Sequence, residues 1–329
     1  MTDPAQQAGS SERFTARLTD TRDRLSEFVH NLAETIGTDL HRLHGLNPER
    51  LSLQELGEHQ AALETLEGRV QRFERLLNAM GQQAAVQRPF DYSRANILLL
   101  SSSKTPGNNE FLAYAGQDIR ELFGAVDKVT FVAYAEGVRG LDAYTNLIRE
   151  KLKGIGGFDV AGVHAGGDPK RAIAEAQAIF IGGGNTHWLL DELYRNELIP
   201  IIRERVEAGV PLLGSSAGTN VASFSIMTTN DMPASDPPLL DALNILPFRI
   251  NPHYIDTDQN TNHRGETRKQ RLEELLAKNS GPVVALREGG MLRLRAGHLS
   301  HQGDGTITLF RNSEPPLEIA KGADLDFLL

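Results

Sequence analysis

The sequence predicts an α/β protein with a mostly parallel sheet, helices on both faces of the sheet and an α-helical hairpin in front. From about residue 95 onward, short apolar runs alternate with amphipathic stretches, a pattern typical of buried parallel strands covered by helices. Over residues 12–81, leucines instead recur at intervals of seven with charged residues between them. This spacing indicates helices that pair along an apolar seam.

The N-terminal repeat comes in two halves. In the first half, Leu18, Leu25 and Leu32 keep the heptad spacing. After Pro48 the same spacing returns, and its members are Leu56, Leu63, Val70 and Leu77, with Leu66, Phe73 and Met80 at companion positions. We expect an antiparallel hairpin or coiled coil that packs on its own domain or on a second copy of the chain. A docking module for a different protein is the alternative.

The expected strands and helices of the α/β region follow in chain order. The apolar runs that predict strands are residues 97–100, 129–133, 160–163, 178–181, 210–213 and 283–286. The amphipathic stretches that predict helices are residues 110–123, 141–152 and 188–206. Residues 291–294 and 306–310 resemble antiparallel strands added at the end. Residues 81–89, rich in glutamine and without periodicity, predict a linker. The expected division is therefore a helical extension with its linker over residues 1–88 and an α/β domain over 89–329.

Composition excludes several classes of function. The formal net charge of −9 disfavours nucleic-acid binding, which needs a basic face. No apolar run approaches the roughly 18 residues that span a bilayer, and residues 1–11 lack the apolar core of a secretory signal. The absence of cysteine excludes disulfides, thiolate metal sites and a cysteine nucleophile. The lack of cysteine says little about the compartment by itself, and a cytoplasmic location is the default expectation. We expect a protein that binds neither nucleic acid nor membrane.

Residues 214–218 carry the first candidate for chemistry. They read Gly-Ser-Ser-Ala-Gly and lie between a predicted strand and a stretch that can begin a helix. In the Gly-x-Ser-x-Gly pattern, small flanking residues permit a tight turn that exposes the serine hydroxyl above the sheet. Ser216 is therefore a candidate nucleophile, and the competing interpretation is an anion-binding turn at a helix start.

A serine hydroxyl needs a base to become a nucleophile. His253 is the candidate, because it follows Ile-Asn-Pro at a predicted strand end. Glu288 comes just after another buried strand and could orient the imidazole. Asp231 is the competing acid. Residues 182–186, Gly-Gly-Gly-Asn-Thr, follow a strand and precede a helix, so their amides could point at an oxyanion.

These segments together resemble one family. The motifs Gly-Gly-Gly-Asn-Thr, Gly-Ser-Ser-Ala-Gly, Thr-Asn-Asp-Met-Pro at 229–233, Ile-Asn-Pro-His at 250–253 and Gly-Glu-Thr-Arg at 265–268 resemble peptidase E, the aspartyl dipeptidase family of serine peptidases. The resemblance covers about residues 95–320. It implies a fold related to class I glutamine amidotransferases and the hydrolysis of dipeptides with an N-terminal aspartate.

The same resemblance assigns roles. Ser216 becomes the nucleophile, His253 the general base and Glu288 the third triad member, with Asp231 kept as the alternative acid. The remaining expected roles are an oxyanion hole from Gly184 and the amide of Ala217, and substrate contacts from Arg268, Asn185 and Thr186. Arg268 would hold the substrate's aspartate, a task suited to a guanidinium that binds a carboxylate through two hydrogen bonds. No metal or cofactor is expected.

Two alternatives stay open at this point. A cyanophycinase-like hydrolase of the same superfamily would cut β-aspartyl-arginine links. A non-catalytic regulator would keep the fold and act through its helical hairpin. The expected partner is a small acidic peptide, and the N-terminal helices could join copies of the chain into a homo-oligomer.

Overall fold

The computed structural model describes residues 30–31, 33–35, 37–38, 41, 52–256 and 266–329. The chain divides into two compact units, Met1–Arg75 and Leu76–Leu329. Helix α2 (Leu53–Val86) confirms the helix predicted from the second heptad series. The first heptad series lies almost wholly outside the described residues, so its pairing with α2 stays a prediction. Among the described helices, none combines the length and apolar character needed to cross a membrane.

The predicted linker at residues 81–89 is wrong over most of its length, because α2 continues to Val86. Two glutamines of this segment are buried rather than solvated. Gln82 donates to the backbone oxygen of Tyr194 (2.8 Å), and Gln83 donates to the Tyr194 hydroxyl (2.8 Å) and to the Ala242 carbonyl (2.9 Å). These long-range contacts make the end of α2 part of the second unit.

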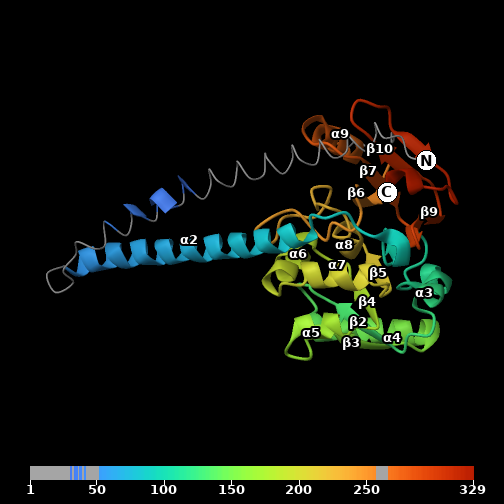
Figure 1. The fold of residues 1–329 in the computed structure, drawn as a ribbon, viewed down its shortest axis with the longest axis horizontal. Coiled ribbons are helices and arrows are strands. Elements are labelled where there is room, and N and C mark those ends of the chain that lie inside the picture. Colours follow the sequence, from blue (N-terminus) through green and yellow to red (C-terminus); the bar gives the residue numbers. More distant parts are fainter. Residues whose placement is uncertain (1–29, 32, 36, 39–40, 42–51, 257–265) are drawn as a thin grey trace. The chain divides into compact units, whose positions relative to one another are not determined.

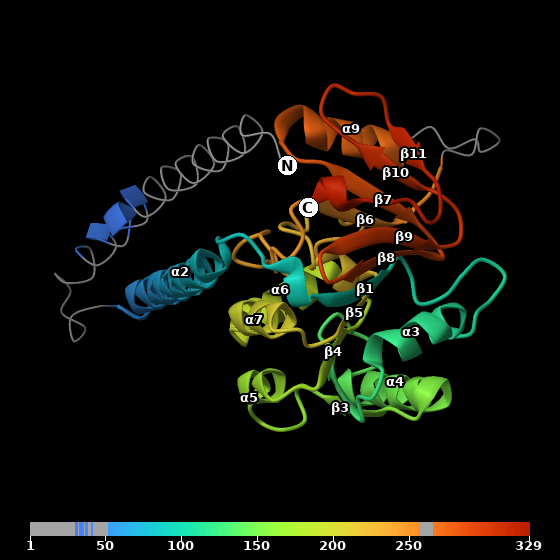
Figure 2. The same cartoon turned by 45° about the vertical axis from the view of Figure 1, so that its right-hand side comes forward.

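The main sheet has seven strands in the order β3-β2-β4-β5-β1-β8-β9, of which Figure 1 labels β2 to β5 and β9, and Figure 2 labels β1 and β8. Its strands are β1 (Asn96–Leu100), β2 (Lys128–Val132), β3 (Asp159–Gly162), β4 (Ala178–Ile181), β5 (Leu212–Ser215), β8 (Gly290–Arg295) and β9 (His298–Gly303). The first five in this order are parallel, and β8 and β9 are antiparallel additions. The mostly parallel sheet predicted from the alternating apolar runs is therefore confirmed.

Helices cover both faces of this sheet. Helices α3 (Gly116–Phe123) and α4 (Leu141–Gly156) pack on one face, and α5 (Pro169–Ala174), α6 (Thr186–Arg195) and α7 (Ile199–Glu207) pack on the other. Strand β1 shows the division, since Leu98 and Leu100 belong to the first core and Ile97 and Leu99 to the second. This follows from the alternation of side chains along a strand. The single helix expected over residues 188–206 is two helices, α6 and α7.

A second, smaller sheet has the order β11-β10-β7-β6, and Figure 2 shows it in orange to red. Its strands are β6 (Arg249–Tyr254), β7 (Val283–Arg287), β10 (Ile307–Phe310) and β11 (Leu317–Ile319). Helix α9 (Arg268–Lys278) packs on it through Leu272 and Leu276. The expectation that residues 283–286 extend the main sheet is wrong, because β7 pairs with β6 and β10 instead.

The two sheets are joined by a very short connection. Strand β7 ends at Arg287 and β8 begins at Gly290, so only Glu288 and Gly289 lie between them. Strand β5 ends at Ser215 in the main sheet, beside β1. The segments expected to carry the serine, the histidine and the glutamate therefore meet where the smaller sheet adjoins the main one.

Candidate active site

Ser216 occupies a sharp turn between β5 and the short helix α8 (Ala217–Asn220). Its backbone has φ 54° and ψ −110°, a conformation that non-glycine residues rarely adopt. The amide of Ser216 donates to the Leu100 carbonyl at 3.0 Å, which fixes the turn to β1. Gly218 is required here, because a Cβ at that position would lie 2.1 Å from the Ile181 carbonyl oxygen. The strand-turn-helix context predicted for Ser216 is confirmed.

His253 lies in an irregularity of β6. The pairing of β6 with β7 shifts register between Asn251 and Tyr254, and His253 has φ 55°. A bulge of this kind turns a side chain away from the ordinary alternation of the strand. The His253 amide donates to Ser101 Oγ (2.9 Å), and that hydroxyl donates to the Leu286 carbonyl (2.9 Å). Ser101 thereby ties β1, β6 and β7 together beneath the histidine.

Ser216, His253 and Glu288 form one hydrogen-bonded chain. Ser216 Oγ lies 2.7 Å from His253 Nε2, and His253 Nδ1 lies 3.0 Å from Glu288 Oε1. A carboxylate beside Nδ1 favours the tautomer with its proton on that atom, which leaves Nε2 free to accept the serine proton. The His253 and Glu288 side chains are 35% and 40% exposed, so water reaches these hydrogen-bonded side chains.

Asp231 has different partners. Its Oδ2 accepts hydrogen bonds from the Thr186 amide (2.8 Å), the Thr186 hydroxyl (2.6 Å) and the Thr229 hydroxyl (3.2 Å). Thr186 is the first residue of α6, where a negative charge is favourable at the positive end of the helix dipole. The structure therefore places Glu288, and not Asp231, within hydrogen-bond distance of His253.

The glycine segment lies beside the serine. A Cβ at Gly183 would lie 3.0 Å from Ser216 Cβ, and one at Gly184 would lie 2.2 Å from the Ala135 carbonyl oxygen. Gly184 has φ 140°. Among the described residues, the amides of Gly184 and Ala217 have no hydrogen-bond acceptor, which leaves both available to a ligand oxygen. This arrangement is compatible with the predicted oxyanion hole, which requires amides that are not already satisfied.

Asn185 and Thr186 hold the neighbouring loop. The Asn185 side chain caps α6 by accepting from the amides of His187 and Trp188, and its Nδ2 donates to the Met232 carbonyl (2.8 Å). Thr186 is buried and donates twice to Asp231. With these groups engaged, the geometry favours a supporting role. Direct contact of either residue with substrate stays a prediction.

Arg268 is the first residue of α9 and lies between Thr267 and Gln270, the two residues that form the capping box of this helix. Its Nη1 is buried and has no hydrogen-bond partner among the described residues. Burial lowers the pKa of Arg268, the charge of Arg271 lowers it further, and the charges of Glu288 and Asp231 raise it. A guanidinium nitrogen that is shielded from water and unpaired is suited to bind an anionic group.

Two residues that support the site, Ser101 and Tyr144, are not predicted from the sequence. The one sequence signal for Ser101 is that a polar residue directly follows an apolar strand, a position at the carboxyl edge of the sheet where site residues gather. Tyr144 of α4 gave no such signal. Its hydroxyl donates to the Gly183 carbonyl and accepts from the Gly183 amide, both at 3.2 Å. It thus holds the glycine segment in place beside Ser216.

Residues with metal-ligand character occur elsewhere. Within the described part of the chain, the group that could hold an ion is His298, Asp324 and Asp326, all exposed. Asp326 accepts from the Leu299 amide and contacts His298 Nδ1 at 3.0 Å. These three residues belong to β9 and the C-terminal segment, which carry none of the predicted site residues.

The fold and the hydrogen-bonded chain are typical of hydrolases that use a serine. The model of Peptidase family S51 matches residues 97–301. The chain belongs to this family.

Known proteins resemble the same region. A Drosophila melanogaster protein named "Probable alpha-aspartyl dipeptidase" is 47% identical over 240 residues, which cover 72% of this chain and 98% of that protein. Peptidase E of Streptomyces coelicolor is 44% identical over 234 residues, covering 71% and 95%. The crystal structure of a peptidase from an acI-B1 Actinobacterium matches with a TM-score of 0.54 at 18% identity, covering 72% of this chain and 98% of that one, and supports the fold.

Proposed function

We propose that this protein is a serine dipeptidase that removes an N-terminal aspartate from dipeptides. The observation that carries the proposal is the hydrogen-bonded chain from Ser216 through His253 to Glu288. The names of the relatives, alpha-aspartyl dipeptidase and peptidase E, support the substrate class.

Catalysis proceeds through an acyl-enzyme. Ser216 Oγ attacks the carbonyl carbon of the aspartyl residue while His253 Nε2 takes the hydroxyl proton. His253 then gives that proton to the leaving amine, and Glu288 stabilises the imidazolium through Nδ1. The negative oxygen of the tetrahedral intermediate is held by the amides of Gly184 and Ala217. Water, activated by His253, releases aspartate and restores the serine.

Substrate selection rests on Arg268. A protein with a net charge of −9 repels an acidic peptide unless positive charge is concentrated at the site. The buried and unpaired Nη1 of Arg268, and the charges of Glu288 and Asp231 that raise its pKa, support a role for Arg268 in binding an anion near the reacting groups. It binds the side-chain carboxylate of the aspartate, and a neutral first residue would leave it unpaired.

The test is a panel of X-Leu dipeptides that differ in the first residue, with β-aspartyl-arginine as a further substrate. Asp-Leu should be cleaved with a far higher kcat/KM than Asn-Leu or Ala-Leu, and S216A should abolish the activity. Preferential cleavage of β-aspartyl-arginine would indicate a cyanophycinase-like enzyme instead. Absence of turnover with every member of the panel would favour a non-catalytic regulator.

We also propose that the protein is cytoplasmic and that it self-associates through its N-terminal helices. The lack of cysteine is consistent with a cytoplasmic location but adds little to this proposal. Self-association through the N-terminal helices is supported by Leu63 and Leu77, two exposed leucines of the heptad series on α2. Light scattering on the full chain and on a variant lacking residues 1–75 tests the assembly, and an unchanged number of subunits would contradict it.

A further inference from the structure

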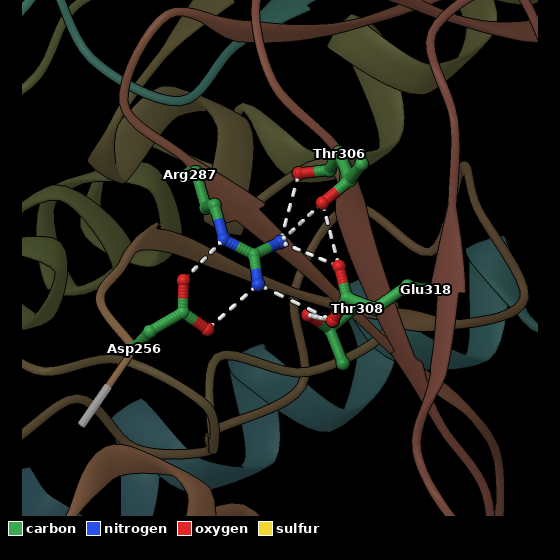
Figure 3. A network of polar contacts seen from close by, with 5 residues as sticks. All are labelled: Asp256, Arg287, Thr306, Thr308 and Glu318. Atoms are coloured by element: carbon green, nitrogen blue, oxygen red, sulfur yellow. Dashed lines mark hydrogen bonds and ion pairs between the residues drawn. The ribbon is translucent and has the colours of Figure 1, made fainter.

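Arg287, the last residue of β7, is the centre of a polar network next to the site (Figure 3). Its Nε and Nη2 donate to the two carboxylate oxygens of Asp256, each at 2.7 Å. Its Nη1 donates to the Thr306 carbonyl (2.9 Å) and hydroxyl (3.0 Å) and to Glu318 Oε2 (3.1 Å), while Nη2 also reaches Glu318 Oε1 (3.2 Å). Every nitrogen of the guanidinium is therefore used.

The acceptors of this network come from the rest of the small sheet. Asp256 follows β6, Thr306 precedes β10 and Glu318 lies in β11. Glu318 also accepts from the hydroxyls of Thr306 (2.6 Å) and Thr308. The Arg287 guanidinium thus connects all four strands of the smaller sheet, β6, β7, β10 and β11, at one end of the sheet. The Arg287 side chain is 21% exposed, whereas those of Asp256 and Glu318 are 64% and 52% exposed. The two parallel bonds to Asp256 and the network with Glu318 distinguish this group from an isolated surface ion pair.

The network lies one residue away from the proposed catalytic pair. Arg287 is paired in register with Tyr254, and its guanidinium lies 5.4 Å from the centre of the Tyr254 ring. His253 precedes Tyr254, and Glu288 follows Arg287. Within the described residues the guanidinium makes no hydrogen bond to His253 or Glu288, so any influence on them passes through the backbone.

The β8 end of the connection through Glu288 and Gly289 is held by backbone hydrogen bonds that do not involve Arg287. The Gly289 carbonyl accepts from the Asp304 amide (3.1 Å), and the Gly290 carbonyl accepts from the Ser101 amide (3.0 Å). Arg287 is therefore a side-chain anchor on the β7 side of the two-residue connection, in addition to Ser101, whose hydroxyl donates to the Leu286 carbonyl. Without Arg287, the end of β7 is held less firmly against the bulge in β6, and the Nδ1–Oε1 distance is less well fixed.

We propose that Arg287 is a positioning residue for the reaction, which holds the ends of β6 and β7 together so that His253 and Glu288 stay aligned. This inference rests on the proposed serine peptidase function. It differs from a purely stabilising role, because it requires Arg287 to affect the chemical step in molecules that remain folded.

The first experiment compares Arg287→Met and Arg287→Lys with the parent, using Asp-Leu hydrolysis well below the unfolding temperature. R287M should lower kcat on the order of 10- to 100-fold with little change in KM, since a small misalignment of catalytic groups slows chemistry without removing Arg268. R287K should have a kcat between those of R287M and the parent, because an ammonium keeps the charge but lacks the planar fork that binds Asp256 through two parallel hydrogen bonds. Arg311→Met is the control, as Arg311 pairs with Glu314 outside this network.

The second experiment does not depend on the peptide substrate. The chain has no cysteine, so Ser216→Cys introduces its only thiol. His253 next to that thiol accepts its proton, and the resulting thiolate is alkylated by iodoacetamide faster than an isolated thiol at neutral pH. Adding R287M should slow this alkylation several-fold, toward the rate with His253→Ala, while adding R311M should leave it unchanged.

The kinetic and alkylation experiments together distinguish a failure of the proposed substrate class from a failure of the positioning role of Arg287. If the parent cleaves no aspartyl dipeptide but alkylation of S216C responds to R287M, the proposed substrate is wrong and the positioning role stands. If R287M fails to fold, Asp256→Asn and Glu318→Gln decide, because each removes one partner and should slow alkylation in the same direction. Unchanged kcat and alkylation in folded R287M, or a loss confined to KM, would overturn the inference.

Discussion

Ser216 and His253, whose side chains meet at 2.7 Å, both have positive φ angles, 54° and 55°. Such conformations cost on the order of 1–3 kcal/mol for a non-glycine residue and persist only where neighbouring contacts enforce them. The enforcing contacts are the bonds from the Ser216 amide to Leu100 and from the His253 amide to Ser101 Oγ. Strain is thus concentrated where the proposed nucleophile and base meet.

Replacing Ser216 should separate activity from stability. Both S216A and S216G should lose hydrolysis of Asp-Leu, because neither supplies a nucleophile. S216G should be more stable than S216A by about 1 kcal/mol, since glycine accepts the positive φ that alanine resists. Urea unfolding followed by circular dichroism measures the difference. Retained hydrolysis by either variant would remove Ser216 as the nucleophile.

The two candidate acids should behave differently when neutralised. Glu288→Gln removes the charge beside His253 Nδ1 and should lower kcat on the order of 100-fold or more with little effect on stability. Asp231→Asn removes the negative charge of a group that accepts three hydrogen bonds at the start of α6 and should lower the unfolding free energy by about 1–2 kcal/mol. Steady-state kinetics and urea unfolding on both variants test this, and a larger loss of kcat in D231N would reverse the assignment.

Arg268→Ala should lower kcat/KM for Asp-Leu on the order of 10- to 100-fold, the loss expected when charged hydrogen bonds to a substrate disappear. Cleavage of Ala-Leu should change far less. Arg271→Ala is the matched control, because Arg271 is an exposed arginine of the same helix that lies 3.7 Å from Glu266. An equal effect of R268A on both dipeptides would show that Arg268 does not read the aspartate.

His301 of β9 should make the protein less stable in acid. The side chain is fully buried, and burial lowers the pKa of His301 more than the nearby backbone of Ala320 raises it. The unfolded chain therefore binds a proton first, and stability falls as pH drops below about 6.5, by at most about 1.4 kcal/mol per pH unit.

Urea unfolding at several pH values between neutral and mildly acidic tests this expectation for the parent and for His301→Leu. The leucine variant should lose less stability on acidification, since it has no buried imidazole to protonate. Identical pH dependence in the two proteins would contradict the role given to His301.

Much of the fold could be predicted from the sequence because its strands are buried on both faces. Runs such as residues 97–100 and 178–181 are apolar throughout, and this continuity identifies parallel strands between helices. The same property conceals which sheet a strand joins, so the apolar run at residues 283–286 does not reveal that it pairs with β6 and β10 outside the main sheet. The end of α2 resembles a linker in sequence, because Gln82 and Gln83 look like solvated residues and their partners Tyr194 and Ala242 are distant in sequence.

The site was predictable to the extent that local turns reveal it. The glycines around Ser216 indicate a crowded turn, and the position of Ser216 directly after a predicted strand indicates that it lies at the edge of the sheet. The sequence does not decide between Glu288 and Asp231, because proximity to His253 depends on the bulge in β6 and on the short connection from β7 to β8. Ser101 acts through its hydroxyl, which bonds to the backbone of His253 and Leu286, and both residues are distant from it in sequence.

The connection through Glu288 and Gly289 also sets the order in which the site can be assembled during synthesis. Ser216 and the parallel strands around it leave the ribosome first, and β6 with His253 follows. The acid, and the strand β8 that lies against β1, come only afterwards. A nascent chain therefore carries its serine without a complete set of partners, and under the proposed function it cannot cleave peptides until its C-terminal strands are in place.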